Sequence, residues 1–252
     1  METVSRTIVL IPSRLASTRF PRKPLAEVSG EAMIVQVWRR AVASGVGTVV
    51  VACGDEEIAQ AVQAAGGRAV MTHPGHPSGS DRIYEALEIL DPERTVERIV
   101  NLQGDLPTIE PVAIRKVLEP LSDRKVDIAT LAAEITDPDE RNDPNVVKVV
   151  AALGEDIDVA QALYFTRATA PAGDGPLWHH IGLYAYQRAA LETFVALPPS
   201  KLEQRERLEQ LRALEAGLRI DVARVEMAPL GVDTPADLDR ARQLLKSDDT
   251  LR

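Results

Sequence analysis

Residues 7–25 read TIVLIPSRLASTRFPRKPL, in which a short apolar run leads directly into a loop rich in arginine and lysine. The run at 7–11 has the length and composition of a buried β-strand. The loop carries cationic and hydroxyl side chains at Arg14, Arg19, Arg22 and Lys23 and at Ser13, Ser17 and Thr18. Such a concentration of donors suits a polyphosphate. A solvated basic loop at a sheet edge would have the same composition.

The loop differs from two common nucleotide-binding signatures. A Walker loop needs four residues between a glycine and Gly-Lys-Ser/Thr, and this pattern does not occur in the sequence. A Gly-x-Gly-x-x-Gly motif is also missing, which disfavours a nicotinamide-dependent dehydrogenase.

Apolar runs of strand length alternate with amphipathic stretches of helix length in the first half of the chain. We expect strands at 7–11, 48–53, 68–71 and 98–102, with helices at 33–43, 55–65 and 81–90, the second of them capped by Asp55. This alternation is typical of parallel βαβ units.

The pattern changes after residue 127. Strand-like pieces at 127–134, 146–153 and 160–166 follow one another without full helices between them, which indicates an inserted β-rich arm. Helices are expected at 188–195 and 201–216, a strand at 220–225, and a last helix with Thr234 as its N-cap. The sequence thus predicts an α/β fold: a Rossmann-like, mostly parallel sheet flanked by helices, in one domain (1–252) with a β-rich insertion at about 127–180.

Composition excludes several partners and locations. The formal net charge of −9 argues against nucleic acid, which normally binds a basic face. The single cysteine, Cys53, ends an apolar run and is expected to be a buried strand thiol in a reducing compartment. The four-residue apolar run near the N-terminus is too short for a signal peptide or a membrane span. We therefore expect a cytoplasmic protein that binds neither membrane nor nucleic acid.

Two aspartates stand where a metal could bind. Asp105 directly follows the predicted strand 98–102 and a glycine, and Asp233 lies in a predicted strand-to-helix turn. Ligands of open parallel sheets bind outside the carboxyl ends of the strands, where Arg14 also falls. Mg²⁺ needs few protein carboxylates when phosphate oxygens complete its coordination. Each aspartate alone is compatible with helix capping, and the pair favours a magnesium–triphosphate site.

The histidines give weaker indications. His179 and His180 precede a predicted strand and could bind a carboxylate or hydroxyl group, but no cysteine or acidic residue stands at zinc-ligand spacing. His73 and His76 lie in a proline-rich turn, which is typical of a surface loop.

Eight segments, in order along nearly the whole chain, resemble the 3-deoxy-manno-octulosonate cytidylyltransferase (CMP-Kdo synthetase) family. They are IPSRLASTRFPRKPL (11–25), HPSGSDR (76–82), NLQGD (101–105), NVVKVV (145–150), ALYFTRA (162–168), HIGLYAY (180–186), LEQLR (208–212) and GVDTP (231–235). Each segment is a weak signal alone, and the shared order makes the resemblance specific. The chain departs from the family at Arg22, where glycine is usual, and at Leu106, where glutamate is frequent.

This resemblance implies transfer of CMP from CTP to the anomeric hydroxyl of Kdo, with release of pyrophosphate, for lipopolysaccharide synthesis. It also implies a homodimer formed through the β-rich arm. Arg14 and Lys23 would bind the triphosphate, and Asp105 and Asp233 would hold Mg²⁺. Further contacts to the nucleotide would come from Ser13, Ser78, Gly79, Ser80 and Gln103. Contacts to Kdo would come from Arg167, His180, Tyr184, Glu209 and Gln210.

Two other functions stay open. A cytidylyltransferase for another acid sugar, such as an acylneuraminate or an amino-substituted Kdo, would use the same activation chemistry and differ only in its sugar pocket. A catalytically silent nucleotide-binding protein would not need Arg14, Lys23, Asp105 and Asp233 together, so the complete set favours an enzyme.

Overall fold

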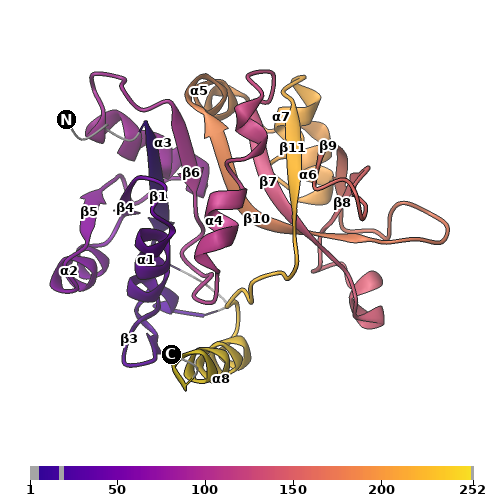
Figure 1. Cartoon of the computed structure of the whole chain (residues 1–252). Helices are drawn as coiled ribbons and strands as arrows, with labels where there is room; N and C mark the ends of the chain where they lie inside the picture. Colours follow the sequence, from indigo (N-terminus) through magenta and orange to yellow (C-terminus); the bar gives the residue numbers. More distant parts are fainter. Residues whose placement is uncertain (1–5, 17–19, 251–252) are drawn as a thin grey trace. The chain divides into compact units, whose positions relative to one another are not determined.

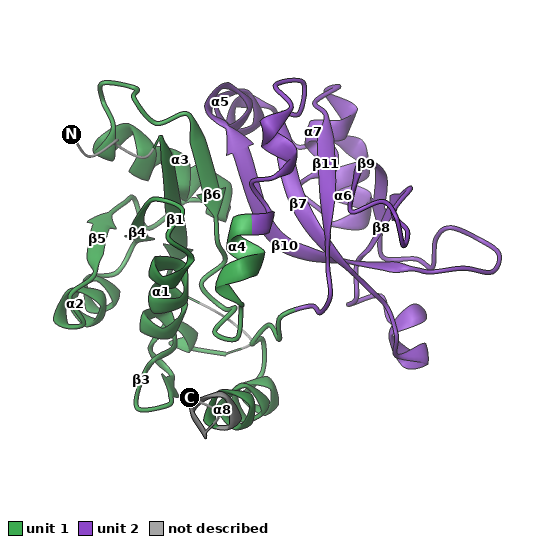
Figure 2. Cartoon of the chain, in the orientation of Figure 1, with its two compact units in different colours: residues 1–115, 229–252 green, residues 116–228 purple. Residues whose placement is uncertain are grey.

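The computed structural model describes residues 6–16 and 20–250. Ser17, Thr18 and Arg19 of the predicted phosphate loop therefore lie outside the described residues. The chain forms two compact units, one of residues 1–115 with 229–252 and the other of residues 116–228 (Figure 2).

Within the described residues, the first unit is built on four parallel strands in the order β5, β4, β1, β6 (Figure 1). Their bounds are Thr7–Ser13 for β1, Thr48–Cys53 for β4, Arg68–Met71 for β5 and Arg98–Asn101 for β6. Strand β1 lies between β4 and β6 and is buried along nearly all its length, as expected for a sheet covered on both faces. The predicted parallel βαβ arrangement is confirmed.

The helices of this unit connect the strands in the predicted order. They are α1 Met33–Ser44, α2 Glu56–Ala64 and α3 Gly79–Leu90, with the short α4 Pro111–Lys116 after β6. The connections through α1 and α2 step outward from β1 to β5, whereas the connection through α3 returns to β6. Right-handed crossovers therefore put α3 on the face opposite α1 and α2.

A small separate core supports the segment that follows the phosphate loop. This segment contains the 3₁₀ helix η1 Lys23–Leu25 and the hairpin β2 Glu27–Val28 and β3 Glu31–Ala32. Val28 packs with Val232 and with Leu238 of α8, which spans Pro235–Thr250. The predicted N-cap of α8 is confirmed, since Thr234 Oγ1 accepts a hydrogen bond from the Asp237 N–H at 3.2 Å. The C-terminal helix thus stabilises the backbone on both sides of the site described below.

Within the described residues, the second unit has a mixed sheet in the order β10, β7, β11, β9, β8. The strands are β7 Ile128–Glu134, β8 Lys148–Ala151, β9 Val159–Thr166, β10 Trp178–Gln187 and β11 Ile220–Val225. Strands β7 and β11 are parallel, and β8 pairs with both β9 and the start of β10. This unit is wider than the 127–180 segment expected to form an arm, and the role of that segment in dimerisation stays a prediction.

The predicted single helix over 201–216 is wrong. The structure has two short helices, α6 Lys201–Glu206 and α7 Leu211–Glu215, and Arg207 between them has φ 56°, in the left-handed region that ends helices. The side chain of Arg167 stabilises this break, because its Nε donates to the main-chain oxygen of Glu206 at 2.9 Å. The preceding helix, α5 Arg188–Ala196, agrees with the prediction.

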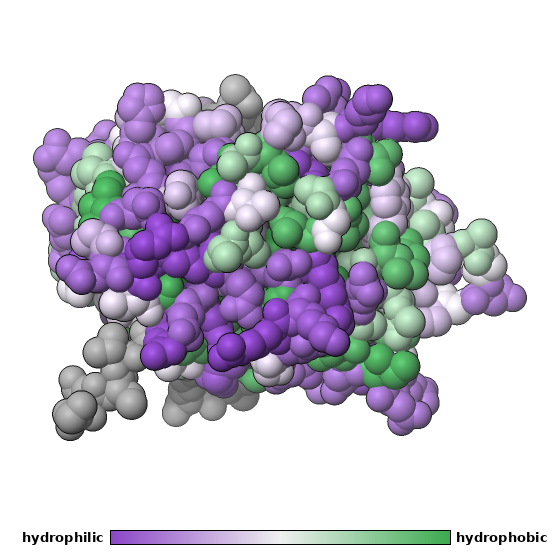
Figure 3. Space-filling view, turned by 90° about the horizontal axis from the view of Figure 1, so that it is seen from above, coloured by the Kyte–Doolittle hydropathy of each residue, from purple (hydrophilic) through white to green (hydrophobic). Residues whose placement is uncertain are grey.

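The surface is mostly hydrophilic on the face shown in Figure 3, with smaller hydrophobic groups between the polar ones. Leu163 of β9 is one of the more exposed apolar residues, at 66%. Cys53 is buried, and burial raises the pKa of its thiol to about 11, so the predicted structural role is confirmed. Among the described helices, none is long and apolar enough to cross a membrane.

Candidate active site

A cavity of about 770 Å³ lies in the first unit, where β1 and β6 end. Its walls combine the end of β1, η1, the start of α3 with the turn before it, the segment after β6 and the turn before α8. The lining residues are Pro12, Ser13, Arg14, Ala16, Lys23, Pro24, His76, Ser78, Gly79, Arg82, Gln103, Gly104, Asp105 and Asp233. The carboxyl edge of a parallel sheet is where such folds bind their ligands.

Gly104 allows the segment after β6 to approach the end of β1. A Cβ atom at this position would lie 3.2 Å from the main-chain oxygen of Pro12 and 3.2 Å from Cδ1 of Ile34. Both contacts are tighter than packed side chains normally make, so a larger residue would push the segment outward. The close approach brings Asp105 to the cavity wall.

Lys23 lies between the two predicted metal-binding carboxylates. Its Nζ donates to Asp105 Oδ2 at 2.8 Å, to Asp233 Oδ1 at 3.2 Å and to the main-chain oxygen of Val232 at 2.8 Å. Burial lowers the pKa of Lys23, but the charges and hydrogen bonds of Asp105 and Asp233 outweigh it and raise the pKa overall. Lys23 is therefore a firmly protonated cation on the cavity wall.

The oxygen atoms around Lys23 Nζ are of the kind that bind a hard metal cation. All of its partners are oxygen atoms, and carboxylate and carbonyl oxygens are the groups that Mg²⁺ prefers. In the described residues, no group of three or more His, Cys, Asp or Glu could hold a metal ion. A divalent ion held by Asp105 and Asp233 would therefore need further oxygen ligands from a substrate or water, as is usual for Mg²⁺ beside phosphates.

Two residues of the phosphate loop contact the N-terminal end of α2 and the residue before it. Asp55 occupies the N-cap position of α2, as predicted, but makes no side-chain cap. Its Oδ2 instead accepts from the Leu15 N–H at 2.8 Å. At the other end, the guanidinium of Arg22 forms an ion pair with Glu57 of α2. Asp55 and Glu57 thus hold Leu15 and Arg22, two described residues of the loop, in place.

Arg22 has a left-handed backbone, with φ 58° and ψ 21°. Glycine adopts this conformation without steric cost, whereas a residue with a Cβ does so with strain. The conformation gives a physical reason for a glycine at this position of the loop. In this chain the ion pair with Glu57 accompanies the strained backbone.

Ser13 and Arg14 present donors to the cavity in different ways. Ser13 is only 6% exposed, and its Oγ has no hydrogen-bond partner among the described residues. A buried hydroxyl without a partner is costly, so a ligand or water is expected to bind it. Arg14 is exposed, and its Nη1 donates to the main-chain oxygen of His76 at 3.3 Å. Its side chain thus bridges two walls of the cavity.

The other predicted nucleotide contacts, Ser78, Gly79, Ser80 and Gln103, differ in their placement. Ser78 caps α3, because its hydroxyl accepts from the Asp81 N–H at 3.2 Å and donates to Asp81 Oδ2 at 2.7 Å. The Ser78 hydroxyl therefore uses its hydrogen atom within the helix cap. Gly79 and Gln103 also line the cavity, whereas Ser80 is 3% exposed and is not among the lining residues.

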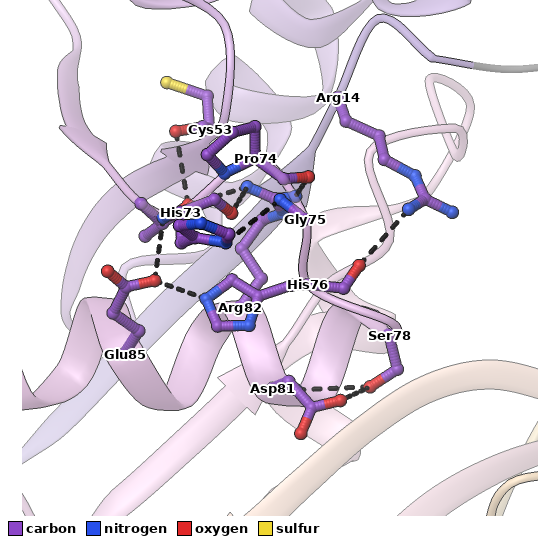
Figure 4. A network of polar contacts seen from close by, with 11 residues as sticks. Arg14, Cys53, His73, Pro74, Gly75, His76, Ser78, Asp81, Arg82 and Glu85 are labelled. Atoms are coloured by element: carbon purple, nitrogen blue, oxygen red, sulfur yellow. Dashed lines mark hydrogen bonds and ion pairs between the residues drawn. The ribbon is translucent and has the colours of Figure 1, made fainter.

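Arg82 is a cavity residue to which sequence reasoning assigned no role. It is 2% exposed, and its guanidinium donates to Thr72 Oγ1 at 2.7 Å and to the main-chain oxygens of His73 and Pro74, each at 3.3 Å (Figure 4). Burial, followed by the charge of Arg14, lowers the pKa of Arg82. The arginine therefore fixes the turn before α3 and places positive charge beside the cavity.

Gly54 makes room for this arrangement. A Cβ atom at residue 54 would lie 2.9 Å from Nη1 of Arg82 and 3.0 Å from Cα of Pro74. On the outer side of the turn, Glu85 of α3 pairs with His76 Nε2 and accepts from the His73 N–H (Figure 4). The predicted surface loop is thus an organised wall of the cavity.

The predicted sugar-binding residues all lie in the second unit. Arg167 donates to three main-chain oxygens, those of Glu206 and Pro144 at 2.9 Å and of Arg207 at 3.5 Å. Carbonyl groups orient a guanidinium without neutralising it. The main-chain N–H of Arg167 also donates to Glu206 Oε2 at 3.0 Å. The guanidinium is therefore held in a fixed orientation, which suits a carboxylate ligand.

His180 is buried and neutral. Burial, with a smaller contribution from His179, lowers its pKa to about 3. Thr130 Oγ1 lies 3.0 Å from His180 Nε2 and can donate to the main-chain oxygen of Ile181 at 3.0 Å or of Leu183 at 2.9 Å. Which of the two atoms, Oγ1 or Nε2, donates to the other depends on the tautomer of the ring. A neutral imidazole has one donor and one acceptor nitrogen in either tautomer, so it can form a hydrogen bond to a hydroxyl group.

Tyr184 lies next to His180, with the ring centres 5.5 Å apart. Burial and then the charges of Tyr186 and Glu209 raise the pKa of Tyr184 well above its usual value, which keeps the phenol protonated. Gln210 is 6% exposed, and its Nε2 has no hydrogen-bond partner among the described residues. Sequence reasoning thus found a phenol and an amide that both have capacity for a polar ligand.

Comparison with known proteins agrees with this geometry. The sequence model of the cytidylyltransferase family matches residues 8–220. The 3-deoxy-manno-octulosonate cytidylyltransferase of Methylobacterium radiotolerans is 66% identical over 244 residues, which cover 96% of this chain and 98% of that protein. The chain belongs to the 3-deoxy-manno-octulosonate cytidylyltransferase family. The enzyme of the same name from Azorhizobium caulinodans is 65% identical over 248 residues, covering 98% of both chains.

A solved structure supports the fold of this cytidylyltransferase. It is described as CMP:2-keto-3-deoxy-manno-octonic acid synthetase complexed with CTP, and it is similar with a TM-score of 0.88 and 38% sequence identity over 97% of this chain and 100% of that chain. The predicted α/β fold class and the family resemblance are therefore confirmed.

The structure of this family member unites most of the predicted nucleotide-side residues. Arg14, Lys23, Asp105 and Asp233 line one cavity, together with Ser13, Ser78, Gly79 and Gln103. Their individual roles stay predictions. Arg82, Asp55 and Gly54 were missed as site residues. The position of Arg82 four residues after Ser78, on the same side of the first turn of α3, was a signal that could have found it.

Proposed function

We propose that this protein transfers CMP from CTP to the anomeric hydroxyl of Kdo and releases pyrophosphate, which activates the sugar for lipopolysaccharide synthesis. The observation that carries the proposal is the meeting of Lys23, Asp105 and Asp233 on the wall of a cavity at the carboxyl edge of the sheet. A nucleotidyl transfer needs such a combination, because cations must bind the phosphates and carboxylates must hold a metal ion.

The residues of the cavity have separable tasks in this reaction. Arg14 and Lys23 bind the triphosphate and stabilise the charge that develops on the α-phosphate and on the leaving pyrophosphate. Ser13 offers a buried hydroxyl. Arg82 holds the turn before α3 against which the nucleotide lies. The sugar hydroxyl attacks the α-phosphorus, a P–O bond forms, the bond to the β-phosphate breaks, and the hydroxyl proton leaves.

We also propose that the reaction requires Mg²⁺, held by Asp105 and Asp233. When bound there, the ion would neutralise phosphate charge and lower the pKa of the attacking hydroxyl. The support is the all-oxygen donor set that already surrounds one cationic atom in this structure.

On the sugar side, we propose that Arg167 binds the carboxylate of Kdo and that His180, Tyr184, Glu209 and Gln210 contact its hydroxyls. The fixed guanidinium of Arg167 and the Nε2 atom of Gln210, which has no hydrogen-bond partner among the described residues, support these roles.

The test follows pyrophosphate release with CTP, Mg²⁺ and one sugar at a time: Kdo, an amino-substituted Kdo and N-acetylneuraminate. Release with Kdo at the highest kcat/KM is the expected result. If pyrophosphate is released only with another sugar, that sugar and not Kdo is the substrate. If none of the three sugars gives pyrophosphate, the protein binds nucleotide without catalysing the transfer.

We propose further that the protein is a cytoplasmic homodimer. The exposed face of β9, which carries Val159 and Leu163, supports a dimer through the second unit. Sedimentation velocity of the full chain should show a dimer that Leu163→Arg weakens. Met227→Arg alters an apolar residue outside β9 that is 76% exposed, against 66% for Leu163, and is the matched control. A Leu163→Arg protein that remains dimeric would place the interface elsewhere.

A further inference from the structure

The ammonium group of Lys23 occupies the space that a metal ion would need. Its Nζ lies 2.8 Å from Asp105 Oδ2 and 3.2 Å from Asp233 Oδ1, so both carboxylates point to the same atom. A metal ion bound by these oxygens cannot share that space with a protonated amine. The two roles of the site, metal binding and phosphate binding, therefore compete for the position of one side chain.

We infer, on the basis of the proposed function, that Lys23 blocks the metal site until nucleotide phosphates offer its ammonium group another acceptor. Metal and nucleotide then bind cooperatively. In the nucleotide-free protein, Lys23 serves as the counter-ion of Asp105 and Asp233. In the complex, the side chain moves to the triphosphate and the carboxylates are released to the metal.

Three contacts make the nucleotide-free state specific. Besides the two ion pairs, Lys23 Nζ donates to the main-chain oxygen of Val232 at 2.8 Å. The Val232 N–H in turn donates to the main-chain oxygen of Asp105 at 2.9 Å. The lysine thus closes a connected group in which both carboxylate-bearing segments are joined. The side chain of Lys23 is 15% exposed and that of Asp105 35%, so water screens this ion pair less than the pair with Asp233, whose side chain is 51% exposed.

Formal charge gives the physical reason for the coupling. Two carboxylates and one ammonium group leave a single negative charge, which is a weak attraction for a divalent ion whose approach also meets the ammonium. If the Lys23 ammonium left the carboxylates but found no new acceptor, it would stay close to the metal ion, and the two positive charges would repel each other. A triphosphate removes this difficulty because it accepts the ammonium and contributes metal ligands at the same time.

The movement needs no change of the main chain. Lys23 begins η1, and the Ala26 N–H donates to its main-chain oxygen at 3.1 Å. Pro24 beside it is buried, and Val28 and Val232 belong to the core under α8. Only the four-carbon side chain of Lys23 has to turn from the carboxylates toward the cavity that it lines.

The test measures binding of Mn²⁺, as a probe for the divalent ion, by the electron paramagnetic resonance signal of the free ion in the absence of nucleotide. Lys23→Met keeps an unbranched side chain that lacks only the terminal nitrogen position, and removes its charge. We expect it to bind Mn²⁺ at least about tenfold more tightly than the unmodified protein, within the usual range of coupling between sites. Lys23→Gln is a second variant that can keep the hydrogen bond to Val232.

A matched control separates occupancy from general electrostatics. Arg22→Met removes the same charge one position away, where the guanidinium pairs with Glu57 and not with the metal-binding carboxylates. Its Mn²⁺ affinity should stay within about twofold of the unmodified protein. Equal tightening in Arg22→Met and Lys23→Met would overturn the inference, and so would unchanged affinity in both folded Lys23 variants.

A further variant distinguishes failure of this inference from failure of the proposed function. Asp105→Asn combined with Lys23→Met should lose the tightened Mn²⁺ binding. If Mn²⁺ binds Lys23→Met tightly whether or not Asp105 is changed, the metal assignment in the proposed function is wrong. If Asp105→Asn weakens Mn²⁺ binding but Lys23→Met does not strengthen it, only the blocking role of Lys23 is wrong.

Discussion

Lys23 Nζ lies 2.8 Å from Asp105 Oδ2, although 82 positions separate the two residues in the sequence. The same nitrogen lies 3.2 Å from Oδ1 of Asp233, which is 210 positions from Lys23 in the sequence. Three segments of the first unit therefore meet at one charged atom. This meeting point decides which side chains of the first unit can act together on a nucleotide.

Asp105→Asn should reduce kcat by on the order of 100-fold while the protein stays folded, because the amide keeps the shape of the side chain but loses the negative charge that would bind a metal ion. The measurement is pyrophosphate release at saturating CTP and Mg²⁺, with circular dichroism to check folding. Asp239→Asn removes an exposed carboxylate of α8 and is the control. Near-normal turnover of Asp105→Asn would remove this residue from the metal site.

Arg82→Met should raise the KM for CTP about tenfold with a smaller effect on kcat, since the turn before α3 loses its buried donor and the cavity loses a positive charge. Gly54→Ala should act in the same direction, because its methyl group would displace the guanidinium or Pro74.

Arg68→Met, at an exposed arginine of β5, is the control for loss of charge. Arg82→Lys separates charge from orientation: it should recover part of the affinity for CTP but not all of it. If Arg82→Met left KM unchanged in a folded protein, the turn would not depend on this residue.

Arg22→Gly should be more stable than Arg22→Ala. Both variants lose the ion pair with Glu57, but only glycine adopts φ 58° without strain. We expect the melting temperature of the glycine variant to be higher by about 2–4 °C, the shift typical of a small stability change in a chain of this size. Equal melting temperatures would indicate that the loop relaxes out of the left-handed conformation when the ion pair is lost.

Stability should fall below neutral pH partly through His180. Its pKa is about 3 in the folded protein against 6.5 in a free chain, so between these values the unfolded chain binds a proton that the folded protein does not. Protons bound preferentially by the unfolded state make stability rise with pH across this window. From about pH 7.5 to about pH 5, the free energy of unfolding should fall by about 2 kcal/mol through this group alone.

Urea unfolding at both pH values measures this effect. His180→Gln can keep a hydrogen bond to Thr130 and cannot titrate, so its loss of unfolding free energy between the two pH values should be smaller by about the same 2 kcal/mol. If the unfolding free energy of both proteins changed equally with pH, His180 would take up its proton in the folded protein at the same pH as in the unfolded chain.

Local sequence patterns were enough to predict much of the fold and the type of site. The apolar run at 7–11 and its counterparts at 48–53, 68–71 and 98–102 predicted the parallel strands, because strand length and burial leave a direct mark on composition. The rule that ligands bind at the carboxyl ends of such strands then singled out Arg14 and Asp105. The order of eight family-like segments specified the chemistry.

Contacts between segments that are distant in the sequence could not be predicted from local sequence patterns. An aspartate at a helix start reads as a cap, yet Asp55 bonds to Leu15 because the loop returns past it. Arginine rarely has a left-handed backbone, so the sequence did not predict the turn at Arg22 or the helix break at Arg207. Both were found only in the structure. Lys23 and Asp105 were predicted as separate phosphate and metal ligands. Packing brings their charges within hydrogen-bond distance, and Coulomb attraction then pairs them with each other.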